Sequence, residues 1–164
     1  MPYSDIMAPF VPTTLELVNE MLELAKLKPG EILVDLGCGD GRILCSAAKI
    51  GATAIGIEID RRLIRLALDK AKALGVEWNV HLILVNLLNV DLSRANVVTM
   101  YLTTFANEEI RPKLERELRH GTRVVSHDFP IAKWYTKEIL NFNEIAFIHT
   151  LFLYVLSIKE TRIA

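Results

Sequence analysis

A cluster of three glycines directly after a short apolar run constrains the fold of this chain more than any other feature. The run Ile32–Leu36 follows the turn Pro29-Gly30 and leads into Gly37–Gly41, which reads GCGDG. A short apolar run bounded by turn residues is typical of a buried strand, and Arg42–Ile50 is long enough for a helix. Glycine permits the sharp turn between them and lets a ligand approach the backbone. The sequence therefore predicts a strand, a tight turn and a helix, a corner at which open α/β sheets bind ligands.

Strand-like and helix-like segments alternate along most of the chain. Strands are expected at Ile32–Leu36, Thr53–Ile59, Val80–Val85, Val97–Leu102 and Thr122–Ser126. Helices are expected at Thr14–Leu27, Arg42–Ile50, Arg61–Leu74 and Asn107–Leu118. This alternation is typical of parallel strands joined by crossover helices.

The C-terminal part departs from that alternation. Two β-rich runs, Lys137–Glu144 and Ile148–Ile158, follow the fifth strand with only a short gap between them. Too few residues remain for a crossover helix, so the two runs are expected to pair as an antiparallel hairpin at one edge. The expected fold class is α/β, a Rossmann-like, seven-stranded, mostly parallel sheet with an antiparallel C-terminal hairpin.

Length, charge and cysteine content narrow the class of protein. The 164 residues suggest a single domain spanning residues 1–164. With 19 basic and 20 acidic residues, the chain lacks the basic excess of a nucleic-acid reader. Its two cysteines, Cys38 and Cys45, fit neither a zinc site nor a disulfide framework, so no metal is expected. We expect a reduced, cytoplasmic compartment.

No membrane-targeting segment is expected. Met1–Phe10 has no basic region followed by an apolar run, so it does not resemble a signal peptide. The longest apolar stretch, Ile145–Ile158, has 14 residues, whereas a membrane helix needs about 20. We interpret that stretch as a buried strand.

The spacing and charge of the glycine turn favour one cofactor over another. A dinucleotide site has the pattern Gly-x-Gly-x-x-Gly, but here the third glycine comes one residue early. Asp35 and Asp40 would repel a pyrophosphate, whereas S-adenosylmethionine carries a sulfonium and an ammonium. Glu58, at the end of the second strand, can accept hydrogen bonds from a ribose diol in either family. The sequence therefore favours S-adenosylmethionine, with a nicotinamide or flavin site and a bare structural turn as the alternatives.

Several segments of the chain resemble known methyltransferases. Val34–Arg42 matches motif I of the class I S-adenosylmethionine-dependent methyltransferases at nine positions. Phe10–Thr13, Met100–Leu102 and Ser126–Phe129 resemble the archaeal broad-specificity protein lysine methyltransferases and their mitochondrial relatives, which modify inner-membrane carrier and ATP synthase proteins. The resemblance covers nearly the whole chain and implies the class I methyltransferase fold.

The resemblance also implies where the cofactor lies. It places Asp35, Gly37 and Gly39 around the methionine moiety, Glu58 on the ribose and Asn86 with Leu87 beside the adenine, and it lays Pro12 and Thr13 over the cofactor. Many relatives have an acidic residue at the position of Asn86, whose carbonyl can still accept from the adenine amino group. The expected cofactor-binding residues are thus Pro12, Thr13, Asp35, Gly37, Gly39, Asp40, Glu58, Asn86 and Leu87.

Three residues at strand ends are candidates for the acceptor site and for catalysis. Tyr101 lies where adenine- and glutamine-type N-methyltransferases often carry Asp/Asn-Pro-Pro-aromatic, and the sequence YLTT lacks that motif. An aromatic wall for a cationic chain fits Tyr101. His127 and Asp128 end the fifth strand at the ligand edge, either in an acceptor pocket or as a polar strand end. No general base stands out, His149 is assigned no role, and the lysine proton is expected to leave to water.

These features support one leading hypothesis and two alternatives. The leading one is a monomeric, cytoplasmic enzyme that methylates exposed lysines of several proteins, without nucleic-acid or membrane partners. A methyltransferase for a small molecule or RNA is the first alternative, although no long insertion could form a lid over a small substrate and the net charge of -1 disfavours RNA. A non-catalytic cofactor-binding module is the second, and the intact glycine motif with Glu58 speaks against it.

Overall fold

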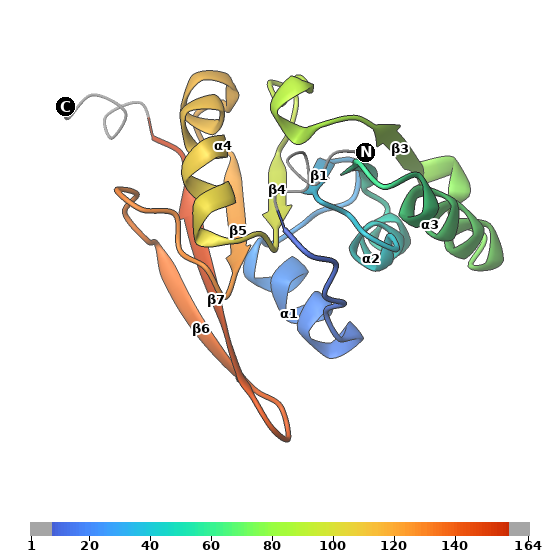
Figure 1. The fold of residues 1–164 in the computed structure, drawn as a ribbon, viewed down its shortest axis with the longest axis horizontal. Coiled ribbons are helices and arrows are strands. Elements are labelled where there is room, and N and C mark those ends of the chain that lie inside the picture. The colour runs from blue at the N-terminus through green and yellow to red at the C-terminus, as the bar shows by residue number, and fades with distance from the viewer. Residues whose placement is uncertain (1–7, 158–164) are drawn as a thin grey trace.

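One mixed seven-stranded sheet organises the computed structural model, which describes residues 8–157 (Figure 1). The strands lie in the order β3-β2-β1-β4-β5-β7-β6. Their bounds are β1 (Ile32–Leu36), β2 (Thr53–Glu58), β3 (Val80–Leu84), β4 (Val97–Met100), β5 (Arg123–His127), β6 (Glu138–Asn143) and β7 (Ile148–Val155). The first five pair in parallel, whereas β7 runs antiparallel to both β5 and β6. The predicted fold class, including the C-terminal hairpin, is confirmed.

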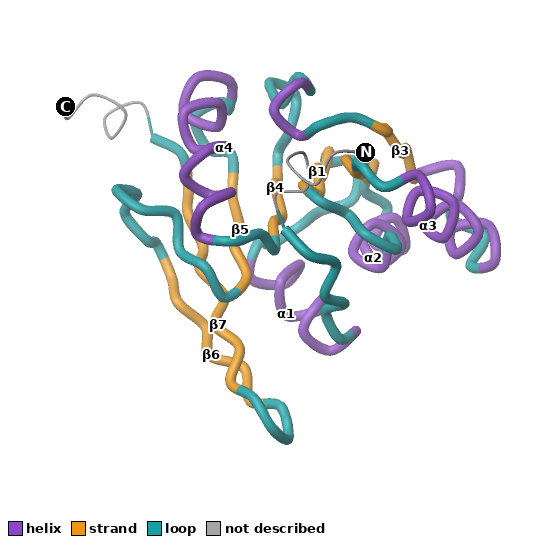
Figure 2. The backbone as a smooth tube through the Cα atoms, viewed as in Figure 1, coloured by secondary structure: helices purple, strands orange, loops and turns teal. Residues whose placement is uncertain are grey.

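Four helices cover the two faces of this sheet (Figure 2). They are α1 (Leu15–Leu24), α2 (Arg42–Ile50), α3 (Arg61–Ala73) and α4 (Thr104–Glu117). One hydrophobic cluster joins α1 and α2 to the sheet, and a second joins α4 to the opposite face. Burial of both faces explains why the central strands β1, β4 and β5 read as continuous apolar runs, whereas the outer strands β3 and β6 are largely exposed.

The connections agree with the expected loop after β3 and differ at the start of α4. Between β3 and β4 the described chain forms the short 3-10 turn η3 (Leu87–Asn89) and a loop. Helix α4 begins three residues earlier than expected, because the side chain of Thr103 accepts a hydrogen bond from the Ala106 N–H and caps it. A further 3-10 turn, η2 (Glu77–Asn79), precedes β3.

The third glycine of the turn serves the packing of two helices. Gly41 caps α2 with φ +78°, and a Cβ atom at this position would lie 2.7 Å from the Cβ of Ala67 in α3. Only glycine both adopts this backbone conformation readily and allows so close an approach. The glycine motif thus fixes α2 against α3 as well as the turn itself.

Two expectations about the chain ends reach beyond the described residues. The first seven residues of Met1–Phe10 and the last residue of Ile148–Ile158 lie outside the described range. Within residues 8–157, no helix has the length and apolar character needed to cross a membrane.

Candidate active site

A cavity of about 550 Å³ opens at the carboxyl ends of β1 and β2, beside the glycine turn. The segment from Ala8 to Thr13 lines one side of it and continues into α1. Every residue expected to bind the cofactor lines this cavity: Pro12, Thr13, Asp35, Gly37, Gly39, Asp40, Glu58, Asn86 and Leu87. Tyr101 lines it as well, so the structure gathers these predicted positions around one space.

Asp35 is a buried carboxyl group at the floor of this region. Its side chain accepts a 2.8 Å hydrogen bond from the Thr99 hydroxyl, and the residue is 3% exposed. Burial raises the pKa of Asp35 from 3.8 to about 7, against the lowering effect of that bond and with help from the charge of Glu58. Within residues 8–157, the groups that shift this pKa are a hydroxyl and two carboxylates, none of them a cation. A cationic ligand would supply the missing charge.

Glu58 is fixed as a hydrogen-bond acceptor at the end of β2. Its Oε2 accepts from the Gly39 N–H at 3.0 Å, and its Oε1 accepts from the N–H groups of Ile59 and Asp60 at 2.8 and 2.9 Å. Oε1 thus accepts two bonds and Oε2 one, which leaves one of the roughly four acceptor positions of the carboxylate free, on Oε2. Glu58 therefore ties the glycine turn to β2 and can still accept from a ligand diol.

Asp40 differs from Asp35 because its charge is already compensated. Its carboxylate pairs with Arg42 at 2.8 Å and with Lys70 of α3. Although burial opposes it, these two cations hold the pKa of Asp40 at about 2. Asp40 therefore attracts a cationic cofactor less strongly than its position in the sequence suggested. Arg42 also donates to the Thr13 carbonyl oxygen at 2.6 Å, which ties the N-terminal segment to this corner.

Gly39 lies against an aromatic ring that the sequence did not place. Its φ is +53°, and a Cβ atom here would come within 2.5 Å of the Phe10 ring. The glycine pattern alone predicts a clash between such a Cβ atom and the ligand. The structure adds Phe10, which is 47% exposed, as a second group that needs the space above this glycine.

Asn86 uses its side-chain carbonyl locally. The oxygen accepts a 2.9 Å hydrogen bond from the Leu88 N–H and caps the η3 turn. The expected contact with an adenine amino group would share this oxygen, which has a second lone pair.

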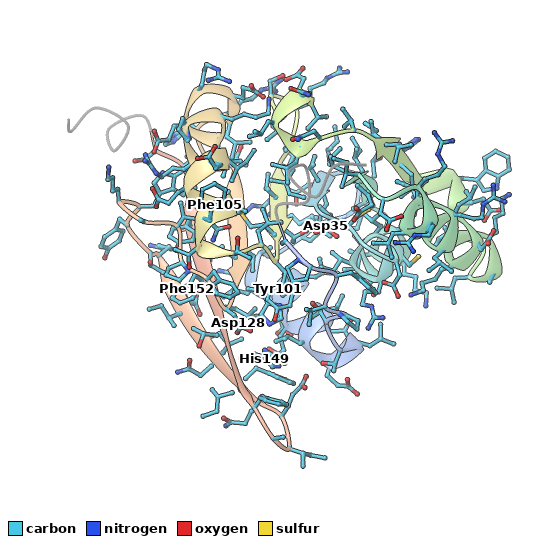
Figure 3. All side chains as sticks on the ribbon, viewed as in Figure 1. Asp35, Tyr101, Phe105, Asp128, His149 and Phe152 are labelled. Carbon is cyan, nitrogen blue, oxygen red and sulfur yellow. The ribbon has the colours of Figure 1, made fainter. Side chains whose placement is uncertain are left out.

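The second half of the site is a cluster of polar side chains from β4, β5 and β7 (Figure 3). The Tyr101 hydroxyl donates to Asp128 Oδ2 at 3.3 Å, and the Tyr101 ring lies 3.7 Å from the His127 ring, centre to centre. His149 Nδ1 lies 3.0 Å from both Asp128 Oδ2 and His127 Nε2. The backbone of Asp128 has φ +59°, and Thr150 holds it through the bond from its N–H to Asp128 Oδ1.

The protonation of this cluster follows from burial and from its internal bonds. Burial lowers the pKa of His127 to about 4, so this imidazole is neutral at pH 7. Burial acts to raise the pKa of Asp128, but the Thr150 N–H and His149 hold it below the ordinary value. Asp128 is therefore an anion next to a neutral imidazole and a tyrosine hydroxyl.

A match to a family model decides what kind of protein this is. Residues 35–138 match the model of the ANTKMT methyltransferase domain, from the buried carboxyl of β1 to the start of β6. The chain belongs to the ANTKMT methyltransferase family. It is therefore an enzyme whose cofactor is S-adenosylmethionine, and the buried, cation-free Asp35 fits that doubly cationic ligand.

Individual relatives of this ANTKMT family chain carry related descriptions. It is 46% identical to a protein-lysine N-methyltransferase of Saccharolobus islandicus, over 90% of this chain and 93% of that one. It is 34% identical to the adenine nucleotide translocase lysine N-methyltransferase of Mus musculus, over 79% of this chain but only 56% of the relative. The solved structure of an RNA methyltransferase from Salinibacter ruber with S-adenosyl-L-homocysteine superposes with a TM-score of 0.83 at 39% identity, covering 88% and 93%.

His149 belongs to the polar cluster of this methyltransferase, but the sequence did not predict it there. The hairpin pairing sets Leu151 opposite His127, and His149, two residues before Leu151 in β7, lies on the same face. A prediction of which residues pair in the hairpin would have placed His149 beside His127. The ligand-type atoms of His127, Asp128 and His149 lie within 4.8 Å of one another. Because they bond one another directly, we interpret them as a hydrogen-bonded cluster and not as a metal site.

Proposed function

We propose that this methyltransferase transfers methyl groups to the side chains of exposed lysines on proteins. The 46% identity to a protein-lysine N-methyltransferase over nine tenths of the chain is the observation that carries the proposal. The proposal includes a single domain that acts as a cytoplasmic monomer without nucleic-acid or membrane partners. A formal charge of -1 supports the absence of a nucleic-acid partner.

The residues around the cavity have distinct roles in this proposal. Asp35 faces the cationic methionine moiety, Glu58 accepts from the ribose diol, and Asn86 with Leu87 borders the adenine. Pro12 and Thr13 cover the cofactor from the N-terminal segment. When bound, S-adenosylmethionine supplies an electrophilic methyl group on its sulfonium.

The acceptor lysine enters between Tyr101 and Asp128. The Tyr101 ring packs on the alkyl stem and on the cation, and the Asp128 carboxylate pairs with the ammonium. His127 lies under both, 1% exposed, and fixes the Tyr101 ring by stacking. With nucleophile and methyl group held in line, proximity supplies much of the rate acceleration.

Few contacts in this acceptor site can select one partner protein over another. An aromatic ring on a cation contributes about 0.5–2 kcal/mol, and selectivity is a difference between affinities. We therefore expect several unrelated proteins to be methylated, mainly at lysines in flexible segments.

RNA methylation is the second candidate. It is favoured by the 39% identity to the Salinibacter ruber structure and by the exposed arginines Arg61, Arg62 and Arg65 at the start of α3. The arginines lie on the α3 side of the cavity, whereas Tyr101 and Asp128 lie toward the hairpin. We rank it second because the lysine methyltransferase match is closer in sequence.

A labelled-cofactor assay separates these functions. The protein is incubated with methyl-labelled S-adenosylmethionine and, in parallel, with unrelated proteins, total RNA and small amines. Mass spectrometry then locates the label, and Gly39→Val, which should not bind the cofactor, serves as the inactive control. Label on lysines of several proteins is expected. Label on RNA or on small amines alone would overturn the lysine proposal, and label on one lysine of one protein would overturn only its breadth.

A further inference from the structure

His149 lies between the acceptor site and solvent, although nothing in the sequence assigned it a role. It comes from β7 of the hairpin, whereas Tyr101 follows β4 and Asp128 follows β5. Figure 3 shows Tyr101, Asp128 and His149 in sequence from the centre of the molecule toward the hairpin. Three segments distant in the chain thus meet at one imidazole.

The contacts form a continuous polar path. Tyr101, which lines the cofactor cavity, donates to Asp128 Oδ2, and His149 Nδ1 lies 3.0 Å from that same oxygen. On its other edge, His149 Nε2 lies 3.7 Å from Glu144 Oε2. His149 is 19% exposed and Glu144 25% exposed, so the path leads from the cavity to solvent.

Glu144 is fixed at the outer end of this path. The Thr14 hydroxyl, which precedes α1, donates to Glu144 Oε1. This leaves Oε2 facing the imidazole. His149 thus has a carboxylate beside each ring nitrogen, Asp128 at 3.0 Å and Glu144 at 3.7 Å.

We propose that His149, with Glu144, carries the proton of the acceptor lysine from Asp128 to solvent. The proposal rests on the proposed lysine methyltransferase function and deepens it. His149 is a positioning and relay residue, because it acts through Asp128 rather than on the methyl group.

The proton balance of the step is simple. In the Nε2–H tautomer, Nδ1 of His149 carries no proton and takes one from the lysine ammonium by way of the Asp128 carboxylate. The ring then releases its Nε2 proton toward Glu144 and water, and proton exchange with water returns it to the Nε2–H tautomer before the next cycle. The neutral amine attacks the methyl carbon, the C–S bonding pair stays on sulfur, and the product is a methylated ammonium. The relay leaves the equilibrium fraction of neutral lysine unchanged, about 0.04% at pH 7 for a pKa of about 10.4, and instead gives the proton a path out of the site while the partner protein covers it.

Other titratable groups facing His149 set the range in which the relay works. They are Asp128 and His127 from β5, Glu144 from the hairpin and, one contact further, Tyr101 after β4. The buried His127 is neutral at pH 7 and adds no charge beside His149.

The test is a substitution that keeps a polar side chain beside Asp128 but cannot gain and release a proton. In His149→Asn, the side-chain amide fills this place and does not titrate. We expect the single-turnover rate of methyl transfer at pH 7 to fall about 100-fold, the scale of general acid–base catalysis, and the deficit to shrink below about threefold at pH 10, where lysine loses its proton unaided. Glu144→Gln should show a smaller deficit with the same pH trend, and imidazole added to His149→Ala should restore part of the rate.

Matched controls separate this result from structural damage. His120→Asn changes an exposed histidine after α4 and should leave the pH profile unchanged. Thermal unfolding and calorimetry with S-adenosylmethionine should match the wild type in all variants. A deficit in His149→Asn that is equal at every pH, or no deficit at all, would overturn the relay.

Two further outcomes keep this proposal apart from neighbouring ones. If the wild-type protein methylates no lysine, the proposed function fails first. If it methylates lysine but a chelator abolishes the rate and Zn²⁺ restores it, the cluster holds a metal and the relay is wrong.

Discussion

The cofactor half and the acceptor half of the site are built in different ways. The cofactor half uses β1, the glycine turn, α2 and β2, which follow one another within Ile32–Glu58. The acceptor half joins Tyr101, Asp128 and His149 from three separate segments. A local motif therefore encodes the first half, whereas only tertiary folding creates the second. Substitutions in the two halves should accordingly affect different measurements, cofactor affinity in one and acceptor turnover in the other.

The largest effect is expected from Gly39→Val in the cofactor half. Its φ of +53° disfavours a β-branched residue, and the new side chain would meet Phe10 and the ligand. We expect no measurable binding of S-adenosylmethionine by calorimetry while the protein remains folded. Gly75→Val is the matched control, since Gly75 also has a positive φ but open space around it. Unchanged affinity in Gly39→Val would contradict the assignment of the turn.

Removing the acceptor at the end of β2 should have the next largest effect. Glu58→Ala should weaken cofactor binding by about 1.5–3 kcal/mol, the scale of hydrogen bonds to a charged group. Part of this loss would come from the freed Gly39 N–H. Asp69→Ala, on the exposed face of α3, is the control. A much smaller effect, measured by calorimetry, would shift the ribose contact to Asp60.

The pH dependence of cofactor binding should report on Asp35. Because its pKa in the folded protein is about 7, a cationic ligand should bind about tenfold more tightly at pH 8 than at pH 6, at about 1.4 kcal/mol per pKa unit. Asp35→Asn should bind more weakly and lose this dependence. An equal pH dependence in wild type and variant would exclude Asp35 as the titrating group.

The same carboxyl group should lower the stability of the ligand-free protein as pH rises. Its folded pKa lies above the ordinary 3.8, so between pH 3.8 and about 7 the folded state binds more protons than the unfolded state. Its contribution to the free energy of unfolding therefore falls through this window. Denaturant unfolding of Asp35→Asn, compared with wild type at pH 5 and pH 7, measures the difference.

The smallest effect is expected in the acceptor half, at Tyr101. Tyr101→Phe removes the long, 3.3 Å bond to Asp128 but keeps the ring, so it should raise the acceptor KM only about two- to fivefold, which corresponds to about 0.5–1 kcal/mol. Tyr101→Ala should cost more through the lost cation contact. Cofactor affinity should stay within about twofold in Tyr101→Phe. A large loss there would show that the two halves are not separable.

The sequence predicted the sheet, and the residues that it proposed for the cofactor lie around one cavity, because both depend on patterns of nearby residues. Apolar runs and glycines marked the strands and the turn, and every expected cofactor residue lines the cavity. The ion pair of Asp40 with Lys70 was not predictable in this way, since it spans 30 positions along the chain. Neither was the Phe10 ring above Gly39. In both cases the deciding contact comes from another element.

The acceptor half was predicted in part. Tyr101, His127 and Asp128 could be named because strand ends at one edge of a parallel sheet collect there. His149 could not, because its place depends on the register of an antiparallel strand, and a shift of one residue would turn it to the other face. Helix α4 shows the same limit on a smaller scale, since its start depends on the capping geometry of Thr103.

The bond from Arg42 to the Thr13 carbonyl oxygen has a consequence for the timing of turnover. The Arg42 guanidinium bonds to both the N-terminal segment and Asp40, and Asp40 also pairs with Lys70 of α3. The segment that lines the cavity is thereby bound to the corner where α2 and α3 meet. We expect these bonds to break in each catalytic cycle. Product release, rather than methyl transfer, should therefore limit kcat when lysine is abundant.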